Sequence, residues 1–209
     1  MSANSRAASL VIGLTGGIGT GKTTVAQMLG GLGAFVVDCD ALGRQVIEPG
    51  GRAYAGVIEH FGREIVRDDG QIDRGALAAI VFRDETALAA LNAISHPAID
   101  AEIADCIAAA PAGSVVVLDM AVLVETDLGA GQYDIVVVVE APLDVRLARL
   151  ARRGMADGDA RARIASQASD AQRRAVADYV IDNAGDLESL HDKVTALWHT
   201  LRGSTHLRR

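Results

Sequence analysis

The chain has 209 residues, of which 50% are hydrophobic but only 3% aromatic, and its formal net charge is −7. This length suits one domain with a substantial core, and the acidic balance argues against a protein that coats nucleic acid or an anionic membrane. No apolar run approaches the roughly 20 residues of a membrane span. Residues 1–9 are not followed by a long apolar region, so we expect a cytoplasmic protein without a secretory signal.

The first predicted element is a buried strand at residues 10–15, followed by a glycine-rich loop and the opening of a helix. Residues 16–23 fit the phosphate-binding pattern G-x-x-x-x-G-K-[ST] without a mismatch. Such a loop turns its backbone N–H groups into an anion-binding concavity at a helix N-terminus. Lys22 would reach the terminal phosphates of a nucleoside triphosphate, and the Thr23 hydroxyl would ligate Mg²⁺. The other nucleotide contacts expected here are Gly17, Gly19, Thr20, Gly21 and Thr24.

Four further apolar runs predict strands at 34–38, 114–119, 135–140 and 179–182. The runs are continuous rather than alternating, as expected of parallel strands that are covered on both faces. Helical patterns lie between them. The sequence therefore predicts an α/β fold with a five-stranded parallel sheet.

The spacing between the second and third strands is far longer than one crossover helix needs. We expect a helical substrate subdomain inserted at residues 49–111, with helices at 74–82, 85–94 and 98–109. His96 would end the second of these and Pro97 would open the third. His96 could contact an anionic group of the substrate or simply cap its helix. A lid is expected at residues 149–172, where a glycine-containing connection separates two arginine-bearing helices.

Two carboxylates follow the second predicted strand. If the strand stays extended, Asp38 and Asp40 lie on the same side at the carboxyl end of the sheet, where ligands bind. Asp40 would then accept the proton of a hydroxyl nucleophile, and Asp38 would hold Mg²⁺ through water. Asp40 could instead cap a helix that starts at Ala41, and the two roles are compatible. Asp119, at the end of the third strand, is a further position where a metal-linked acid is often found.

Eight arginines lie between residues 146 and 174. Arg146, Arg149 and Arg153 would share one helix face, and a planar guanidinium suits bidentate contact with phosphate. We expect phosphate contacts from Arg149, which would act in catalysis with Lys22 and Asp40, and from Arg153. The alternative is a solvated face paired with nearby aspartates. The remaining arginines, including Arg152, Arg161, Arg173 and Arg174, are interpreted mostly as surface charge.

An ordered set of motifs along most of the chain resembles the dephospho-CoA kinase family. The stretches that carry the resemblance are 14–23, 37–40, 48–50, 69–70, 73–74, Leu77, Phe82, 96–97, 147–153, Gln167 and 177–183. The resemblance implies a P-loop kinase that phosphorylates the ribose 3′-hydroxyl of dephospho-CoA with ATP. It also implies a nucleotide contact at Asn183 and substrate contacts at Thr15, Asp40, His96, Leu123 and Glu125. One departure is that Ala121-Val122-Leu123-Val124-Glu125 stands where the family usually has Pro-Leu-Leu-Phe-Glu.

Two other functions stay open from the residues alone. A kinase for another small acceptor, such as a nucleoside monophosphate, would share the loop and lid but would not need the long insert. A non-catalytic nucleotide-binding switch would need a guanine-specificity motif, and no N-K-x-D follows the D-x-x-G at residues 40–43. We therefore expect a monomeric enzyme whose partners are ATP and dephospho-CoA, with no nucleic acid or membrane partner.

Overall fold

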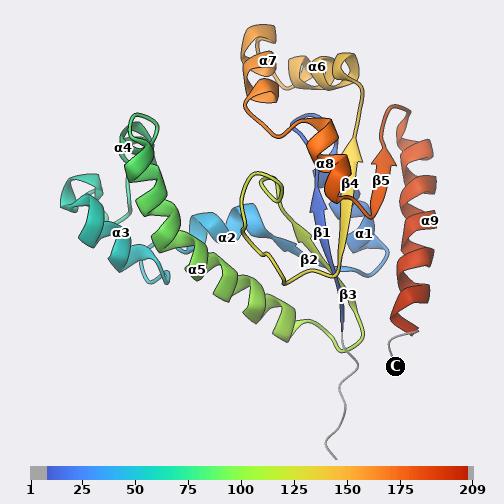
Figure 1. Cartoon of the computed structure of the whole chain (residues 1–209), viewed down its shortest axis with the longest axis horizontal. Coiled ribbons are helices and arrows are strands. Elements are labelled where there is room, and N and C mark those ends of the chain that lie inside the picture. Colours follow the sequence, from blue (N-terminus) through green and yellow to red (C-terminus); the bar gives the residue numbers. More distant parts are fainter. Residues whose placement is uncertain (1–8, 207–209) are drawn as a thin grey trace, which may run out of the picture. The chain divides into compact units, whose positions relative to one another are not determined.

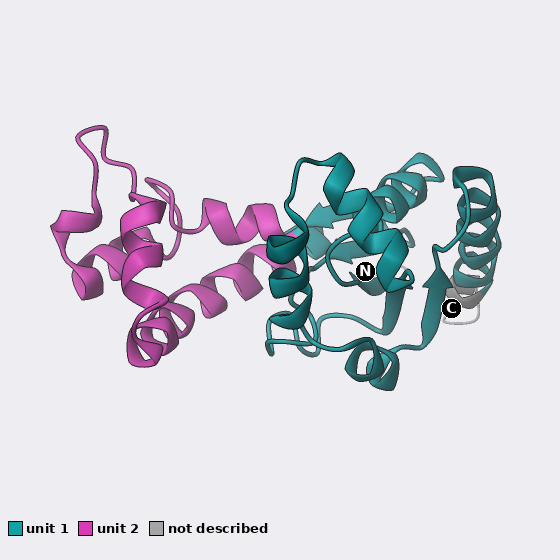
Figure 2. Ribbon diagram, turned by 90° about the horizontal axis from the view of Figure 1, so that it is seen from above, with its two compact units in different colours: residues 1–38, 106–209 teal, residues 39–105 magenta. Residues whose placement is uncertain are grey.

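The computed structural model describes residues 9–206, and its elements are labelled in Figure 1. The chain forms two compact units (Figure 2). The first unit is built from the chain up to Asp38 and from Cys106 onward, and the second from Cys39–Asp105. The first unit contains the sheet and the glycine-rich loop.

The sheet of the first unit has five parallel strands in the order β2-β3-β1-β4-β5. Their bounds are β1 Leu10–Thr15, β2 Phe35–Asp38, β3 Val115–Asp119, β4 Ile135–Glu140 and β5 Tyr179–Asp182. The predicted α/β fold with a five-stranded parallel sheet is confirmed. β1 is the central strand, so the loop that follows it opens at the middle of the sheet's carboxyl edge.

One face of this sheet packs against two helices, α1 (Lys22–Gly31) and α9 (Leu187–His206). β1 contributes Leu10, Ile12 and Leu14 to this face, and they are buried in one apolar cluster with side chains of both helices, including Trp198 of α9. Alternate residues of neighbouring strands extend the same cluster. Because aromatic residues are scarce, branched aliphatic side chains supply most of the buried area that stabilises the sheet.

The opposite face of β1 is covered by the connection between β3 and β4. Gly13 faces this connection, and a Cβ built on it would lie 2.6 Å from Cδ1 of Leu123 and 3.3 Å from the ring of Tyr133. A side chain at residue 13 would therefore displace the connection. The glycine lets Leu123 pack directly on the strand.

Three helices follow β4, namely α6 (Leu143–Arg152), α7 (Asp157–Ala165) and α8 (Asp170–Val176). The expected connection between arginine-bearing helices is present, and α7 begins at Asp157. α8 begins with a capping box in which the Ser169 side chain accepts from the N–H of Gln172 and the Gln172 side chain accepts from the N–H of Ser169. This cap fixes where α8 starts, and with it the place of Arg173, whose N–H donates to the Ser169 carbonyl at 3.0 Å.

The second unit is helical. It contains α2 (Cys39–Gln45), α3 (Tyr54–Phe61), the 3-10 helix η1 (Arg63–Ile65), α4 (Arg74–Val81) and most of α5 (Glu85–Ala109). α4 is capped by the Asp73 side chain, which accepts from the N–H groups of Gly75 and Ala76. These hydrogen bonds, together with Arg67, lower the pKa of the Asp73 carboxyl. The insert expected at residues 49–111 overlaps this unit.

The expected break at residues 96–97 is wrong, because α5 runs through it as one helix with Pro97 inside. A proline within a helix removes one backbone hydrogen bond and crowds the carbonyl four residues earlier. Here Ser95, Ala98 and Ile99 are buried around it. The free energy gained by this packing outweighs the cost of a proline within the helix. His96 therefore does not cap a helix end.

The helices in the described part of the chain include none that is both long and apolar enough to cross a membrane.

We predict that Gly13→Val destabilises the protein by about 1–3 kcal/mol, the usual cost of overfilling a packed core. Urea unfolding of Gly13→Val, Leu123→Ala and the double variant would measure this cost. In the Leu123→Ala background the cost should fall by about 1 kcal/mol or more, because contacting sites couple. Equal costs in both backgrounds would contradict the packing described for Leu123.

Candidate active site

The glycine-rich loop has the backbone shape that its pattern requires. Gly19 and Gly21 have φ values of 81° and 95°, in the left-handed region that favours glycine. The Thr20 hydroxyl donates to the carbonyl of Gly17 at 2.8 Å, and the N–H of Thr20 donates to the same oxygen at 3.2 Å. The loop is thus closed on itself before Lys22 begins α1.

A pocket of about 280 Å³ lies along this loop. Its lining comes from the loop itself, from the segment after β3 and from the segment after β4: Gly16, Gly17, Ile18, Gly19, Gly21, Lys22, Thr23, Ala121, Arg153 and Gln167. Backbone N–H groups at a helix N-terminus, a lysine and an arginine on one concave surface form a suitable site for a polyphosphate.

Lys22 forms an ion pair with Asp119 at the end of β3, and both side chains are 12% exposed. Asp119 also lies opposite Asp38 in the register between β3 and β2. The carboxyl edge of the sheet therefore gathers the loop lysine and two carboxylates. The sequence placed Asp119 at a strand end but contained no signal for its pairing with Lys22.

Arg149 and Asn183 hold the loop through its carbonyl groups. Nη1 of Arg149 donates to the carbonyl of Thr20 at 3.2 Å, and Nη2 donates to the backbone and side-chain oxygens of Asn183 at 3.0 and 3.2 Å. Nδ2 of Asn183 donates to the Thr20 carbonyl at 2.7 Å. Both residues expected at the nucleotide thus lie at the loop, where they fix its backbone. Arg153, in contrast, lines the pocket and is exposed.

Arg146 of α6 is also bound to the loop and is only 4% exposed. Its Nε donates to the Ile18 carbonyl at 2.9 Å, and its Nη1 lies 3.3 Å from a carboxylate oxygen of Asp170. Burial lowers the pKa of the Arg146 guanidinium, while Asp170 raises it. A side chain at Gly17 would collide with this guanidinium, since a Cβ there would lie 2.5 Å from Nη2.

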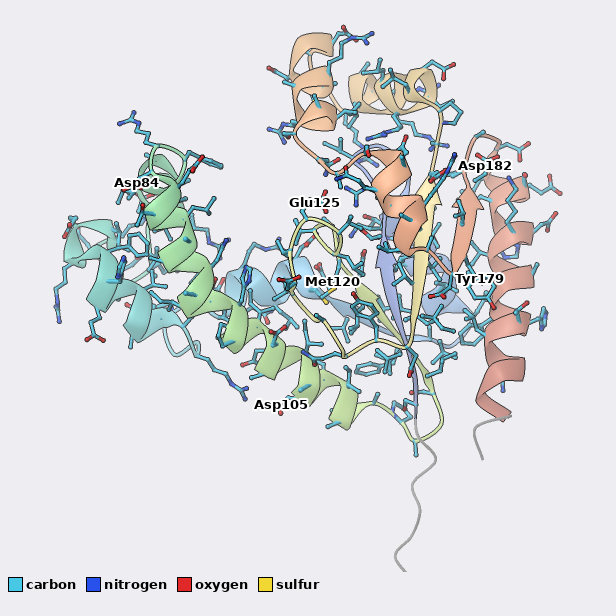
Figure 3. All side chains as sticks on the ribbon, in the orientation of Figure 1. Asp84, Asp105, Met120, Glu125, Tyr179 and Asp182 are labelled. Atoms are coloured by element: carbon cyan, nitrogen blue, oxygen red, sulfur yellow. The ribbon has the colours of Figure 1, made fainter. Side chains whose placement is uncertain are left out.

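The interpretation of Arg173 as surface charge is wrong, because its side chain is 0% exposed. It forms an ion pair with Glu125 and donates to the Thr15 hydroxyl at 3.3 Å. Glu125 lies on the connection between β3 and β4, and Figure 3 shows it near the segment that leads into α8. Sequence periodicity could not reveal this burial, because Arg173 follows an exposed helix start and precedes the exposed Arg174.

The other expected substrate residues are distributed over both units. Leu123 is buried beneath Gly13 rather than along the loop pocket. β2 ends at Asp38 and α2 begins at Cys39, so the alternation that would place Asp38 and Asp40 on one side does not apply. Asp40 lies in the first turn of α2 rather than before it, and it belongs with His96 to the second unit.

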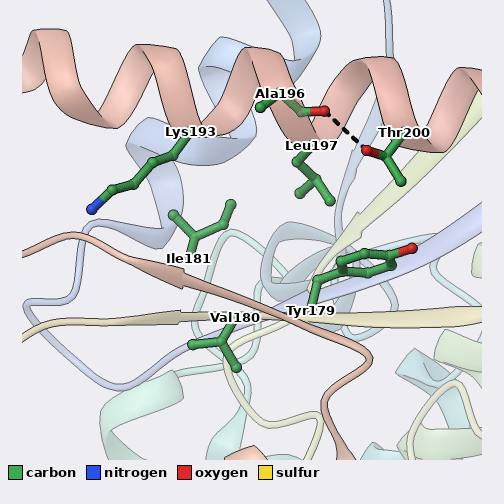
Figure 4. A pocket seen from close by; sticks show the side chains of 7 residues that line it. All are labelled: Tyr179, Val180, Ile181, Lys193, Ala196, Leu197 and Thr200. Carbon is green, nitrogen blue, oxygen red and sulfur yellow. Dashed lines mark hydrogen bonds between the residues drawn. The ribbon is translucent and has the colours of Figure 1, made fainter.

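A second pocket, of about 260 Å³, lies between β5 and α9 (Figure 4). It is lined by Tyr179, Val180, Ile181, Lys193, Ala196, Leu197 and Thr200. The Thr200 hydroxyl donates to the Ala196 carbonyl, and Lys193 Nζ donates to the Asp182 carbonyl. This mostly apolar lining differs from the phosphate-suited lining of the loop pocket.

A parallel sheet whose central strand leads through a phosphate-binding loop into a helix, with further helices after β4, defines the P-loop kinase class. The model of one family within this class, described as dephospho-CoA kinase, matches residues 10–189. A dephospho-CoA kinase of Thermobifida fusca is 47% identical over 95% of this chain and 100% of its own length. The chain belongs to the dephospho-CoA kinase family.

Solved structures agree with this assignment of the fold. A crystal structure of a Thermus thermophilus protein has a TM-score of 0.77 and 33% identity, covering 93% of this chain and 98% of its own. A dephospho-CoA kinase from Campylobacter jejuni has a TM-score of 0.70 at 20% identity over 93% of this chain and 98% of its own, which supports the fold alone.

Some relatives are longer than this chain. A dephospho-CoA kinase of Mycolicibacterium paratuberculosis is 49% identical over 91% of this chain, but the match spans only 47% of that relative's length. The kinase unit is therefore found both at the length of the present chain and within chains about twice as long.

We predict that Asn183→Ala lowers both stability and ADP affinity. The variant removes two hydrogen bonds, one to the Thr20 carbonyl and one from the Arg149 guanidinium, which together contribute about 1–3 kcal/mol, while Arg149 keeps its bonds to the Thr20 carbonyl and to the backbone oxygen of residue 183. If part of this cost falls on the loop, ADP affinity measured by calorimetry should drop about tenfold, equivalent to 1.4 kcal/mol. An unchanged ADP affinity in a folded variant would show that Asn183 does not hold the loop in its binding shape.

Proposed function

We propose that the protein transfers the terminal phosphoryl group of ATP to the ribose 3′-hydroxyl of dephospho-CoA, giving coenzyme A and ADP. The observation that carries the proposal is the loop pocket with Lys22 at the carboxyl edge of the sheet, in a chain that belongs to this family. The pocket's charge suits a polyphosphate. The acceptor is inferred from the family.

The pocket residues would bind the triphosphate and stabilise the charge that develops during transfer. N–H groups at the start of α1 cradle the phosphates, and Lys22 and Arg153 add positive charge along the same surface. In the transfer, the bond from the terminal phosphorus to the β-phosphate oxygen breaks as the bond to the 3′-oxygen forms. Asp40 is proposed to take the proton of the 3′-hydroxyl.

The residues at the loop fit a Mg²⁺ ion that is carried by the phosphates. Thr23 lines the pocket, and Asp38 ends the strand beside Asp119, so hard oxygen ligands are available at the sheet's edge. Among the described residues, no group of three or more histidine, cysteine or acidic side chains could hold a metal by itself. When bound, Mg²⁺ would neutralise the negative charge of the phosphates during transfer. Thr23 and Asp38 are the residues proposed to hold it.

The residues proposed to contact the acceptor include Thr15, Asp40, His96 and Glu125. His96 and Asp40 belong to the second unit, which is inserted between β2 and β3. Thr15 and Glu125 belong to the first unit, where each is already engaged by Arg173.

A cytoplasmic location and a monomeric state remain predictions.

The acceptor is tested by ADP release with Mg²⁺-ATP in the presence of dephospho-CoA, AMP, CMP or shikimate. We expect turnover with dephospho-CoA to exceed that with the other acceptors by far. Lys22→Ala is the matched control, and we expect it to lose at least about 10²-fold in turnover, the scale of one charge-stabilising group. Faster turnover with AMP or CMP would replace dephospho-CoA by a nucleoside monophosphate as acceptor.

Asp40→Asn tests the proposed base. The residue lies in the first turn of α2, where a carboxylate stabilises a helix by about 0.3–1 kcal/mol, so the fold should change little. Turnover should fall about 10²–10⁴-fold, the usual contribution of a general base, with ADP affinity nearly unchanged. Asp38→Asn should lose less turnover and respond more to Mg²⁺ concentration. Retained turnover in Asp40→Asn would move the search for the base to Asp38.

A further inference from the structure

Side chains from distant parts of the sequence hold the first half of the phosphate loop, residues 15–18. At the start of this segment, the Thr15 hydroxyl accepts from Nη1 of Arg173. At its end, the N–H of Ile18 donates to Oε1 of Gln167 at 2.7 Å. Both partners come from the short stretch that connects α7 to α8 and from α8 itself. The loop is therefore bound at two points by one neighbouring segment.

Glu125 joins the two points to each other. One of its carboxylate oxygens accepts from Nη2 of Arg173 and from the N–H of Ala168 at 3.0 Å, and Ala168 directly follows Gln167. The contacts form a closed circuit from Thr15 through Arg173, Glu125 and residues 167–168 back to Ile18. We call this circuit the loop clamp.

A purely stabilising role does not account for Arg173. Its Nε–H is buried without a hydrogen-bond partner in the described part of the chain, and an unmet buried donor costs about 1–3 kcal/mol. Replacing a buried ion pair by apolar residues is often neutral or stabilising. The guanidinium is nevertheless placed where its two Nη groups reach the loop and Glu125 at once, which a lysine or an apolar residue could not do.

We propose that Arg173 is a positioning residue for phosphoryl transfer, acting through the loop clamp on the part of the loop that faces the terminal phosphate. Residues 16–18 and Gln167 line the same pocket as Lys22, which reaches toward the terminal phosphates from the start of α1. In this proposal the terminal phosphate also lies against residues 16–18, so that Arg173 sets the position of that phosphate more than the affinity for ADP. The proposal rests on the proposed phosphoryl transfer at this pocket.

The test compares Arg173→Met with Arg174→Met, the same change at the next residue of α8. Arg174 is 66% exposed and is paired with Glu140, outside the loop clamp. We expect Arg173→Met to lose about tenfold to a hundredfold in kcat, the scale of a misplaced reacting group, after correction for folded fraction. Arg173→Lys should fall between it and wild type. Equal losses in Arg173→Met and Arg174→Met, or an unchanged kcat in Arg173→Met, would overturn the proposal.

Nucleotide affinity gives a readout that does not depend on the acceptor. By calorimetry, Arg173→Met should weaken a non-hydrolysable ATP analogue about tenfold while changing ADP affinity less than about threefold. Equal weakening of both nucleotides would overturn the positioning role. If wild-type protein binds both nucleotides but does not phosphorylate dephospho-CoA, the proposed acceptor fails while this comparison still decides the role of Arg173.

Thr15→Val provides a second, milder variant, since it removes one hydroxyl with little change in volume. We expect it to lower kcat less than Arg173→Met does. In the Arg173→Met background it should have no further effect, because the clamp is already broken at that point. An additional loss in the double variant would show that Thr15 acts independently of Arg173, against the proposal.

Discussion

The site depends on a loop whose backbone must stay open toward phosphate. A concavity of N–H groups binds an anion only through those N–H groups that no other acceptor takes. In this loop the N–H groups of Ile18 and Thr20 are taken, by Gln167 and by the Gly17 carbonyl. Further restraint falls on the carbonyl groups of the loop. Arg149 and Asn183 bind the Thr20 carbonyl, and Arg146 binds the Ile18 carbonyl. Arginine suits this task, because it donates several hydrogen bonds from a planar group that stays charged when buried.

The sheet fixes the position at which the loop begins. β1 lies between β3 and β4, so the loop starts from the most enclosed strand. The arginines, by contrast, come from α6 and α8, which follow β4. A shift of α6 would therefore change the hydrogen bonds at the carbonyl groups of the loop. The helices that follow β4 are thus joined to the loop and its first flanking residue by hydrogen bonds, although these segments are far apart in sequence.

The sequence predicted the strands well, because continuous apolar runs bounded by polar residues have few alternatives in a chain with no membrane-length segment. β1, β4 and β5 have the expected bounds, and β2 and β3 each start one residue later. Predictions from the sequence were wrong where tertiary contacts determine the local structure. Pro97 normally ends a helix, but α5 continues because its neighbours are buried. Arg173 has an exposed neighbour and a polar context, and only the fold brings Thr15 and Glu125 to it.

The same contrast between local sequence signals and tertiary contacts explains which site residues can be predicted from a sequence pattern. A loop that binds phosphate through its own backbone needs glycines at fixed positions along a short stretch of sequence. Residues 16–23 can therefore be recognised from the sequence as such a loop. A residue that holds such a loop in shape has no fixed spacing from it, since any helix that reaches the loop can supply it. Gln167 and Arg173 illustrate this, because both bind residues about 150 positions earlier in the chain. Their roles follow from the closed circuit of contacts, in which Glu125 links the arginine that binds Thr15 to the segment that binds Ile18.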